Sequence, residues 1–175
     1  MKKLGRKTVY ESNWLDLHLD KVELNDGSII ESFHVVDHHR EGVTVVVENE
    51  KEEILFVKAY RYLTNSEEWE TPAGGAERNE DILETGKREV LEETGYHIKN
   101  LEYLLSYYPA SGSNKLKFYI LKAKVDEGQK TESYDTNEIA DVKWFKKEEV
   151  LRMIKTNEIK DGLTLTALMY CLFIK

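Results

Sequence analysis

The sequence predicts an α+β protein in which a largely antiparallel β-sheet packs with helices. Runs of β-branched and aromatic residues, typical of strands, dominate residues 17–62 and return between residues 101 and 145. Three other segments, 80–94, 147–155 and 163–174, have patterns typical of helices. The 175 residues, 41% of them hydrophobic, suffice for one domain with a core or for one domain with a small appendage.

The first 40 residues are expected to form an antiparallel meander. Residues 17–24 and 29–36 are strand-like and flank the turn 25–28, where Asp26-Gly27 favours a hairpin. The main domain would then cover residues 41–175. It opens with a β-branched run at 42–47 and a further strand that begins at residue 54 and continues toward residue 62.

The second half of the chain is expected to add three strands and two helices. Residues 101–108, 116–125 and 142–145 are strand-like, and a helical pattern covers residues 147–155. In the last helix, 163–174, four apolar side chains recur at spacings of three and four and predict its buried face. They are Leu165, Leu168, Met169 and Leu172.

Charge and cysteine content argue against several classes of partner. The net charge of −8 disfavours binding to nucleic acid or to an anionic membrane. Cys171 is the single cysteine, which excludes an internal disulfide and fits a reducing compartment. No apolar run approaches the length of a membrane span, and the first residues lack the pattern of a signal peptide. We therefore expect a cytoplasmic protein.

The segment between Gly74 and Tyr96, GGAERNEDILETGKREVLEETGY, contains seven carboxylates. We expect its helix to run from about residue 80 to residue 94, with Asn79 as N-cap and Gly95 closing it in the left-handed conformation. The buried stripe would be formed by Leu83, Gly86 and Val90.

Glu89, Glu92 and Glu93 fall on an adjacent face of this helix. Like charges at these spacings repel one another, so the segment is either an ordinary solvated helix or a site for a cation. The spacing decides between them, because the segment satisfies G-x5-E-x7-R-E-U-x-E-E-x-G, where U is aliphatic. With a frequency of roughly 0.07 at each fixed position, such a match arises by chance about once per million chains.

This pattern is the Nudix box, and the chain resembles the Nudix hydrolases. The one departure is Tyr96 at a position that is usually aliphatic. The resemblance implies an α/β/α sandwich around a mixed sheet, and hydrolysis of a nucleoside diphosphate linked to another moiety. It also implies Mg²⁺, with Mn²⁺ possible, held by Glu89, Glu92, Glu93 and the carbonyl of Ala73.

The same resemblance assigns further roles within the box and beyond it. Arg88 would orient the glutamates, and Glu92 and Glu93 would take part in catalysis. Residues 60–62 (YRY), 69–74 (WETPAG) and 161–168 (DGLTLTAL) look like the ADP-ribose pyrophosphatase branch. By that match, the substrate side would include Arg61 on the diphosphate, Glu70 and Gly74. Glu138 would be a catalytic base or an extra metal ligand.

The expected substrate loop departs from the pattern of that branch. It reads PASGSNK over residues 109–115, with Ser111 before Gly112 where proline is usual and Lys115 where an acid is usual. We expect Ser111 and Gly112 to contact substrate. ADP-ribose, cut to AMP and ribose 5-phosphate, is the leading candidate, and another nucleotide sugar such as GDP-mannose stays open.

Two other functions also stay open, a nucleoside-triphosphate sanitiser and a non-catalytic Nudix ligand sensor. The meander is too small to be stable alone, so it needs another surface to cover. The resemblance to the nucleotide-sugar pyrophosphatases implies that this surface belongs to a second copy, so that the protein is a homodimer and the meander helps to complete the substrate site.

Overall fold

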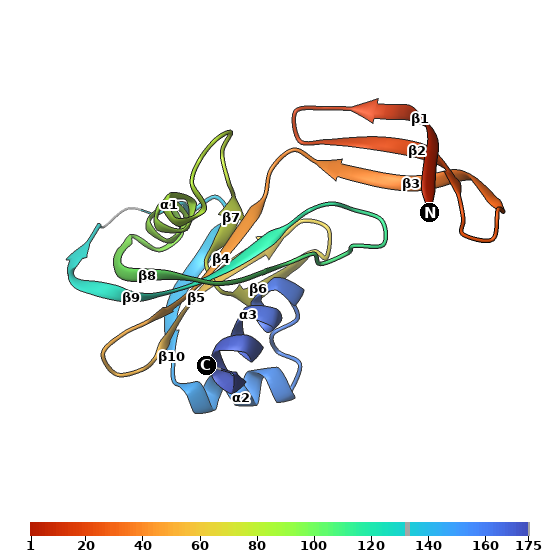
Figure 1. The fold of residues 1–175 in the computed structure, drawn as a ribbon. Helices are drawn as coiled ribbons and strands as arrows, with labels where there is room; N and C mark the ends of the chain where they lie inside the picture. The colour runs from red at the N-terminus through yellow and green to blue at the C-terminus, as the bar shows by residue number, and fades with distance from the viewer. Residues whose placement is uncertain (132–133, 175) are drawn as a thin grey trace. The chain divides into compact units, whose positions relative to one another are not determined.

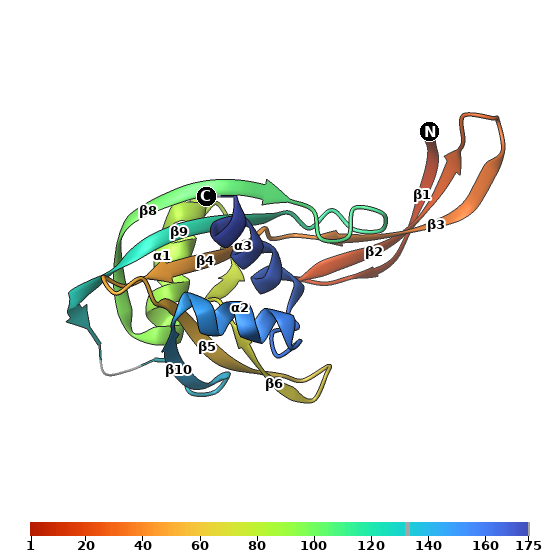
Figure 2. The ribbon, with the colours of Figure 1, turned by 90° about the horizontal axis from the view of Figure 1, so that it is seen from below.

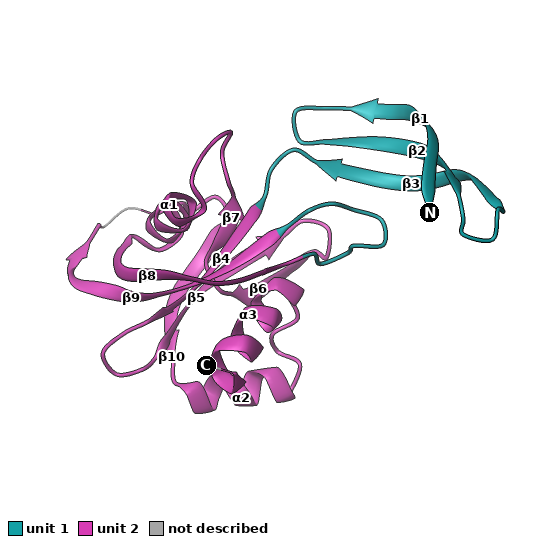
Figure 3. Cartoon of the chain, in the orientation of Figure 1, with its two compact units in different colours: residues 1–41, 108–117 teal, residues 42–107, 118–175 magenta. Residues whose placement is uncertain are grey.

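A computed structural model of the chain describes residues 1–131 and 134–174 (Figure 1). The chain divides into two compact units, which Figure 3 colours separately. Unit 1 comprises residues 1–41 and 108–117, and unit 2 comprises residues 42–107 and 118–175. Each unit is described by itself below.

Unit 1 is a three-stranded antiparallel sheet with the order β1-β2-β3 (Figure 1). Its strands are β1 (Lys2–Glu11), β2 (Leu15–Glu23) and β3 (Ile29–His38). Gly27 has a φ of +83° in the turn between β2 and β3, as the Asp-Gly pair predicts. Only two residues of the unit are buried, His18 and Asp20, and both are polar.

Unit 2 contains a mixed seven-stranded sheet whose main path is β10-β5-β4-β9-β8, with β6 paired to β5 and β7 paired to β4. Strands β4 and β9 run parallel, and the other pairs are antiparallel. The strands are β4 (Gly42–Glu48), β5 (Ile54–Arg61), β6 (Ser66–Glu70), β7 (Ala73–Gly75), β8 (Tyr96–Tyr107), β9 (Phe118–Lys130) and β10 (Ile139–Phe145). The helices are α1 (Ile82–Thr94), α2 (Lys147–Lys155) and α3 (Gly162–Phe173).

Helices cover both faces of this sheet, with α1 on one face and α2 and α3 on the other (Figure 2). Strand β4 supplies both cores because its side chains alternate. Val43 and Val45 join the core under Val90 of α1, whereas Val46 joins the core under Leu168 of α3. The α/β/α sandwich with a mixed sheet is therefore confirmed.

Some details differ from the expectation. Strand β1 was not predicted, because every one of its residues is exposed and it has no apolar alternation. The N-cap of α1 is Asp81 and not Asn79, since the Asp81 carboxylate accepts the Leu83 N–H at 2.8 Å. Asn79 lies in the preceding loop with a φ of +65°. Gly95 closes the helix as predicted, with a φ of +72°.

The buried face of α3 is also rotated from the prediction. Thr164, Ala167, Leu168 and Cys171 are buried, whereas Met169 is 46% exposed. No helix among the described residues is both long and apolar enough to cross a membrane.

Candidate active site

Helix α1 is the platform of the site, and it lies unusually close to the sheet at Gly86. A Cβ built on Gly86 would lie 2.6 Å from Cδ1 of Leu121 and 3.3 Å from Cγ2 of Val45. Both contacts are closer than ordinary packing allows. The glycine inside the helix, which costs about 1 kcal/mol relative to alanine, thus permits the close approach. This approach fixes the height of the glutamate face above the sheet.

Arg88 collects the carboxylates of this face around one guanidinium group. It donates to Glu80 through Nε at 2.9 Å and through Nη2 at 3.0 Å. Nη2 also donates to the carbonyl of Gly75, while Nη1 donates to Glu89 at 2.8 Å and to Glu92 at 3.0 Å. The hydrogen bonds from Arg88 hold the pKa of Glu80 at about 2. Glu80 is therefore ionised and anchors Arg88.

Glu89 lies directly against the backbone of Gly74. A Cβ on Gly74 would be 2.1 Å from Cδ of Glu89 and no more than 2.3 Å from either carboxylate oxygen. Only glycine leaves room for the carboxylate there. Burial raises the pKa of Glu89, although Arg88 opposes the shift. The box glycine and the box glutamate thus meet across two elements, β7 and α1.

Glu93 is held on the next turn of the helix by the same strand. Its Oε2 accepts the backbone N–H of Ala73 at 3.0 Å. The pKa of Glu93 is raised to about 8, mainly by burial and also by the charges of Glu89 and Glu70. The N–H of Ala73 and the charge of Arg61 oppose this shift. Several carboxylates therefore share a poorly solvated place, and a bound cation there would favour their ionised forms.

The connection from β6 to β7 is fixed by a chain of hydroxyl groups. Oγ1 of Thr71 lies 2.7 Å from Oγ1 of Thr44 on β4 and 3.3 Å from Oγ1 of Thr164 on α3. The Thr164 hydroxyl also accepts the N–H of Thr71 at 3.1 Å. All three threonines are buried. This network positions Glu70 on one side and Ala73 on the other.

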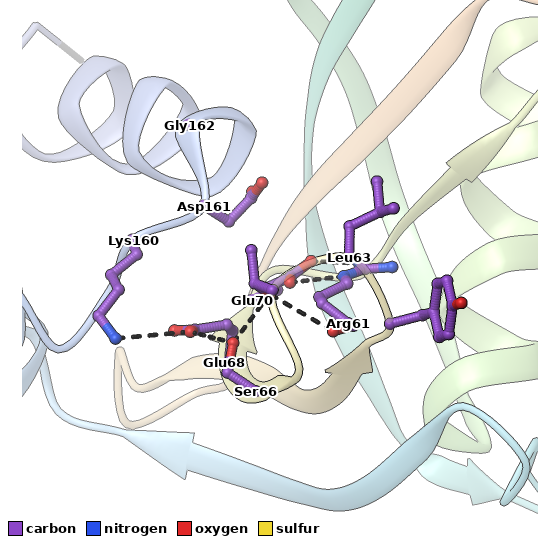
Figure 4. Close-up of a pocket in the computed structure, with 10 residues that line it drawn as sticks. Arg61, Leu63, Ser66, Glu68, Glu70, Lys160, Asp161 and Gly162 are labelled. Carbon is purple, nitrogen blue, oxygen red and sulfur yellow. Dashed lines mark hydrogen bonds and ion pairs between the residues drawn. The ribbon is translucent and has the colours of Figure 1, made fainter.

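Glu70 and Arg61 form a pair on the adjoining strands β6 and β5 (Figure 4). Nε of Arg61 donates to Oε1 of Glu70 at 2.7 Å, and Nη2 donates to Oε2. Burial raises the pKa of Glu70, which is 3% exposed, despite the opposing effect of Arg61. Glu70 in turn raises the pKa of Arg61 above its usual value, so the guanidinium is always charged. The pair lines a cavity of about 630 Å³.

Three other residues predicted to take part are described separately. Glu138 is exposed in the turn before β10, where its carbonyl accepts the N–H of Tyr60 at 3.1 Å. Its side chain makes no hydrogen bond or ion pair to another predicted site residue within 1–131 and 134–174. Ser111 and Gly112 belong to unit 1, in an exposed loop that bonds to β3 where Val36 donates to the carbonyl of Ser113.

The donors around α1 are suited to a hard divalent cation. Glu89, Glu92, Glu93 and the Ala73 carbonyl offer only oxygen, which Mg²⁺ and Mn²⁺ prefer. In the part of the chain that the structure describes, however, no three His, Cys, Asp or Glu side chains converge as ligands. Arg88 donates to Glu89 and Glu92, while the Ala73 N–H donates to Glu93. The residues fit the ion by the chemistry of their donor atoms.

The cavity also contains residues that sequence reasoning missed. Glu68 precedes Glu70 by two positions on β6 and points to the same side. Lys160 reaches it from the segment before α3, with Nζ 3.6 Å from its carboxylate. Asp161 caps α3 by accepting the Thr164 N–H at 2.7 Å. The period of two along residues 66–70 is the signal that could have revealed Glu68.

Comparison with known proteins places these features in a family. Residues 38–166 match the NUDIX domain family, and residues 1–36 match the family described as nucleoside diphosphate sugar hydrolase N-terminal domain. An ADP-ribose pyrophosphatase of Bacillus subtilis (strain 168) is 26% identical over 170 residues, which cover 97% of this chain and 91% of the relative.

Two further similarities extend over nearly the whole chain. A GDP-mannose pyrophosphatase of Escherichia coli O1:K1 is 26% identical over 178 residues, covering 95% of this chain and 93% of the relative. A solved structure described as an ADP compounds hydrolase superposes with a TM-score of 0.85 at 18% identity, over 98% of this chain and 91% of its own. It has the same fold. Because the NUDIX match spans well over half of the sequence, the chain belongs to the Nudix family and is a Nudix hydrolase.

Proposed function

We propose that this Nudix hydrolase cleaves the diphosphate of a nucleoside diphosphate sugar, and that ADP-ribose, cut to AMP and ribose 5-phosphate, is its main substrate. The observation that carries the proposal is the carboxylate cluster on α1, in which Glu89 lies against Gly74 and Glu93 accepts the N–H of Ala73. The charges of Arg61 and Glu70, which line the cavity, act on Glu93. The cluster supplies ligands for a hard cation, and the cavity supplies room for a substrate beside it.

Glu89, Glu92, Glu93 and the Ala73 carbonyl are the groups that would hold Mg²⁺, with Mn²⁺ as an alternative. When bound, the ion offsets the charge of the diphosphate and lowers the pKa of a coordinated water. Arg88 holds Glu89 and Glu92 in place from its anchor on Glu80. It acts on the ligands and not on the substrate.

Arg61 is the residue that would bind the diphosphate. Its Nε and Nη2 are engaged by Glu70, whereas Nη1 has no acceptor among the described residues. The side chain is 44% exposed and lines the cavity. A guanidinium with one free edge suits a phosphate oxygen, and Glu70 keeps that edge turned outward. The backbone at Gly74 would lie beside the same phosphate.

Hydrolysis requires a base that accepts a proton from the attacking water. We assign this role to Glu138, with Glu92 and Glu93 as the catalytic carboxylates of the helix. The water oxygen bonds to one phosphorus, and the bond from that phosphorus to the bridging oxygen breaks. The bridging oxygen leaves with the other phosphate, so the products are two phosphate monoesters.

The nature of the sugar is the least constrained part of the proposal. We assign Ser111 and Gly112 to substrate contacts, in a loop whose residues differ from those usual in the ADP-ribose branch. The GDP-mannose pyrophosphatase relatives make GDP-mannose the second candidate. Initial rates on ADP-ribose, ADP-glucose, GDP-mannose and nucleoside triphosphates, with both products identified, test the assignment. A triphosphate as the best substrate, or nucleotide binding without turnover, would refute it.

We further propose that residues 1–40 form a domain for dimerisation and substrate binding, and that residues 41–175 form the catalytic domain. The enzyme would be a cytoplasmic homodimer. Its partners would be nucleotides and not nucleic acid or membrane. Unit 1 contributes no buried hydrophobic residue, and Val9, Tyr10 and Trp14 on it are more than half exposed. A sheet of three strands without its own core needs another surface to stabilise it.

A further inference from the structure

The cavity lined by Arg61 and Glu70 extends along strand β6. Ser66, Glu68 and Glu70 alternate along the strand and all line the cavity, so its wall carries two carboxylates (Figure 4). Glu70 is satisfied by Arg61. Glu68, in contrast, accepts a hydrogen bond on only one of its two carboxylate oxygens.

Glu68 keeps one carboxylate oxygen free although the residue is only 9% exposed. The Ser66 hydroxyl donates to its Oε1 at 2.8 Å, and Nζ of Lys160 lies 3.6 Å from the same Oε1. Its Oε2 accepts no hydrogen bond in the described part of the chain. Oε2 is also accessible to solvent. An acceptor with a lone-pair edge open to the cavity is therefore available to a ligand.

The groups around Glu68 match the hydroxyls of a sugar. A hydroxyl both donates and accepts, and here a carboxylate that accepts lies beside an ammonium that donates. One carboxylate can accept from two adjacent hydroxyls, as it can from two nitrogens of arginine. Tyr62 and Leu63, which are 83% and 94% exposed, add apolar surface to the same cavity.

We propose that Glu68, supported by Lys160, is a specificity-determining residue that binds a vicinal diol of the substrate. This inference rests on the proposed function, since the diol belongs to the nucleotide sugar whose diphosphate binds Arg61. Two diols have this chemistry, the one on the nucleoside ribose and the one on the terminal sugar.

The test compares Glu68→Gln with the wild-type enzyme on ADP-ribose and on two analogues, one lacking the 2′-hydroxyl of the nucleoside and one lacking the 2-hydroxyl of the terminal ribose. On ADP-ribose, Glu68→Gln should raise KM by about tenfold, because a charged hydrogen bond is lost, and change kcat by less than about twofold. On the analogue that lacks the recognised hydroxyl, the wild-type KM is already raised, and the substitution should add little. The insensitive analogue identifies which diol is bound.

Glu67→Gln is the matched control. Glu67 is the neighbouring residue of β6 on the opposite face, where it pairs with Lys58, and its substitution should leave all three substrates unaffected. Lys160→Met is a second variant that keeps the idea testable if Glu68→Gln fails to fold, since the Lys160 side chain is 59% exposed. It should raise KM for ADP-ribose by about threefold, as expected for an exposed charge.

The outcomes separate the two proposals. Equal behaviour of Glu68→Gln and Glu67→Gln on an active enzyme, or an equal loss of kcat on all three substrates, overturns the subsite and leaves the proposed function standing. A wild-type enzyme that releases no monophosphates from any nucleotide sugar overturns both. Loss of discrimination between ADP-ribose and one analogue supports the subsite.

Discussion

Replacing Gly74 by alanine should disable the site with little loss of stability. The added Cβ would lie 2.1 Å from Cδ of Glu89. Nonbonded carbon atoms rest about 3.5–4.0 Å apart, so the carboxylate must move by about 1.5 Å. A misplacement of about 1 Å at a catalytic group can reduce the rate by about 100-fold. We therefore expect kcat/KM for ADP-ribose to fall by about 100-fold.

The stability cost of this substitution should be small because the atoms in conflict are the end of a side chain. A rotation of Glu89 relieves the contact without moving the backbone, so we expect a loss in free energy of unfolding of about 1 kcal/mol. The assay is steady-state kinetics with Mg²⁺, together with urea unfolding.

Gly128→Ala is the matched control, since the same methyl group on β9 would meet nothing within 4 Å. Activity of Gly74→Ala within threefold of the control would refute the inference that Glu89 must occupy this place.

Three further predictions concern the charge networks and the assembly. Arg88→Lys keeps the charge but loses the paired hydrogen bonds to Glu80, so kcat/KM should fall by about 10–100-fold. Lys87→Arg, on the exposed face of the helix, is the control, and equal kinetics of the two variants would contradict the role of Arg88. Glu48→Gln should lower the free energy of unfolding at pH 7 by about 1–3 kcal/mol, because Glu48 loses its charged partners. Burial alone would raise the pKa of Glu48. The hydrogen bond from Lys124 and the charges of Lys122, Lys124 and Lys147 outweigh burial and leave this pKa below its usual value. The loss should be complete above pH 4.5 and vanish as pH falls through the lowered pKa, as urea unfolding at several pH values would reveal; a loss independent of pH argues against these charges as its cause. Light scattering should give twice the monomer mass of 20.4 kDa, and a monomer at all concentrations would exclude the homodimer.

The carboxylate face of α1 could be predicted from the sequence because its information is local. Helical spacing alone places Glu89, Glu92 and Glu93 on one side, and Gly95 ends the helix as expected. The N-cap was misplaced by two residues, because Asn79 and Asp81 are both good capping residues. Only the backbone distinguishes them, since Asn79 adopts a positive φ in the loop.

Other parts of the site depend on contacts between distant segments, which one sequence does not reveal. Gly74 of β7 contacts Glu89 of α1. The hydroxyl chain from Thr44 through Thr71 to Thr164 joins β4, the connection between β6 and β7, and α3, which are remote in the chain. Strand β1 was missed for a different reason. Its residues are exposed on both faces, so no apolar period marks it.

The roles predicted for Ser111, Gly112 and Glu138 stay predictions. Ser111 and Gly112 lie in unit 1. Glu138 lies in a turn, and its side chain makes no hydrogen bond or ion pair to another predicted site residue within the described ranges. Kinetics of variants at these positions would test the roles, since neither spacing nor burial marks them.

The central claim, hydrolysis that depends on the carboxylates of α1, is tested most directly by Glu93→Gln. The substitution keeps the size and the acceptor for the Ala73 N–H but removes the charge. Glu84→Gln is the control on the same helix, at an exposed residue that pairs with Lys87. With ADP-ribose and saturating Mg²⁺, Glu93→Gln should lower kcat on the order of 1,000-fold while Glu84→Gln stays near wild type. Full activity of a folded Glu93→Gln, or wild-type turnover in excess chelator, would contradict the account.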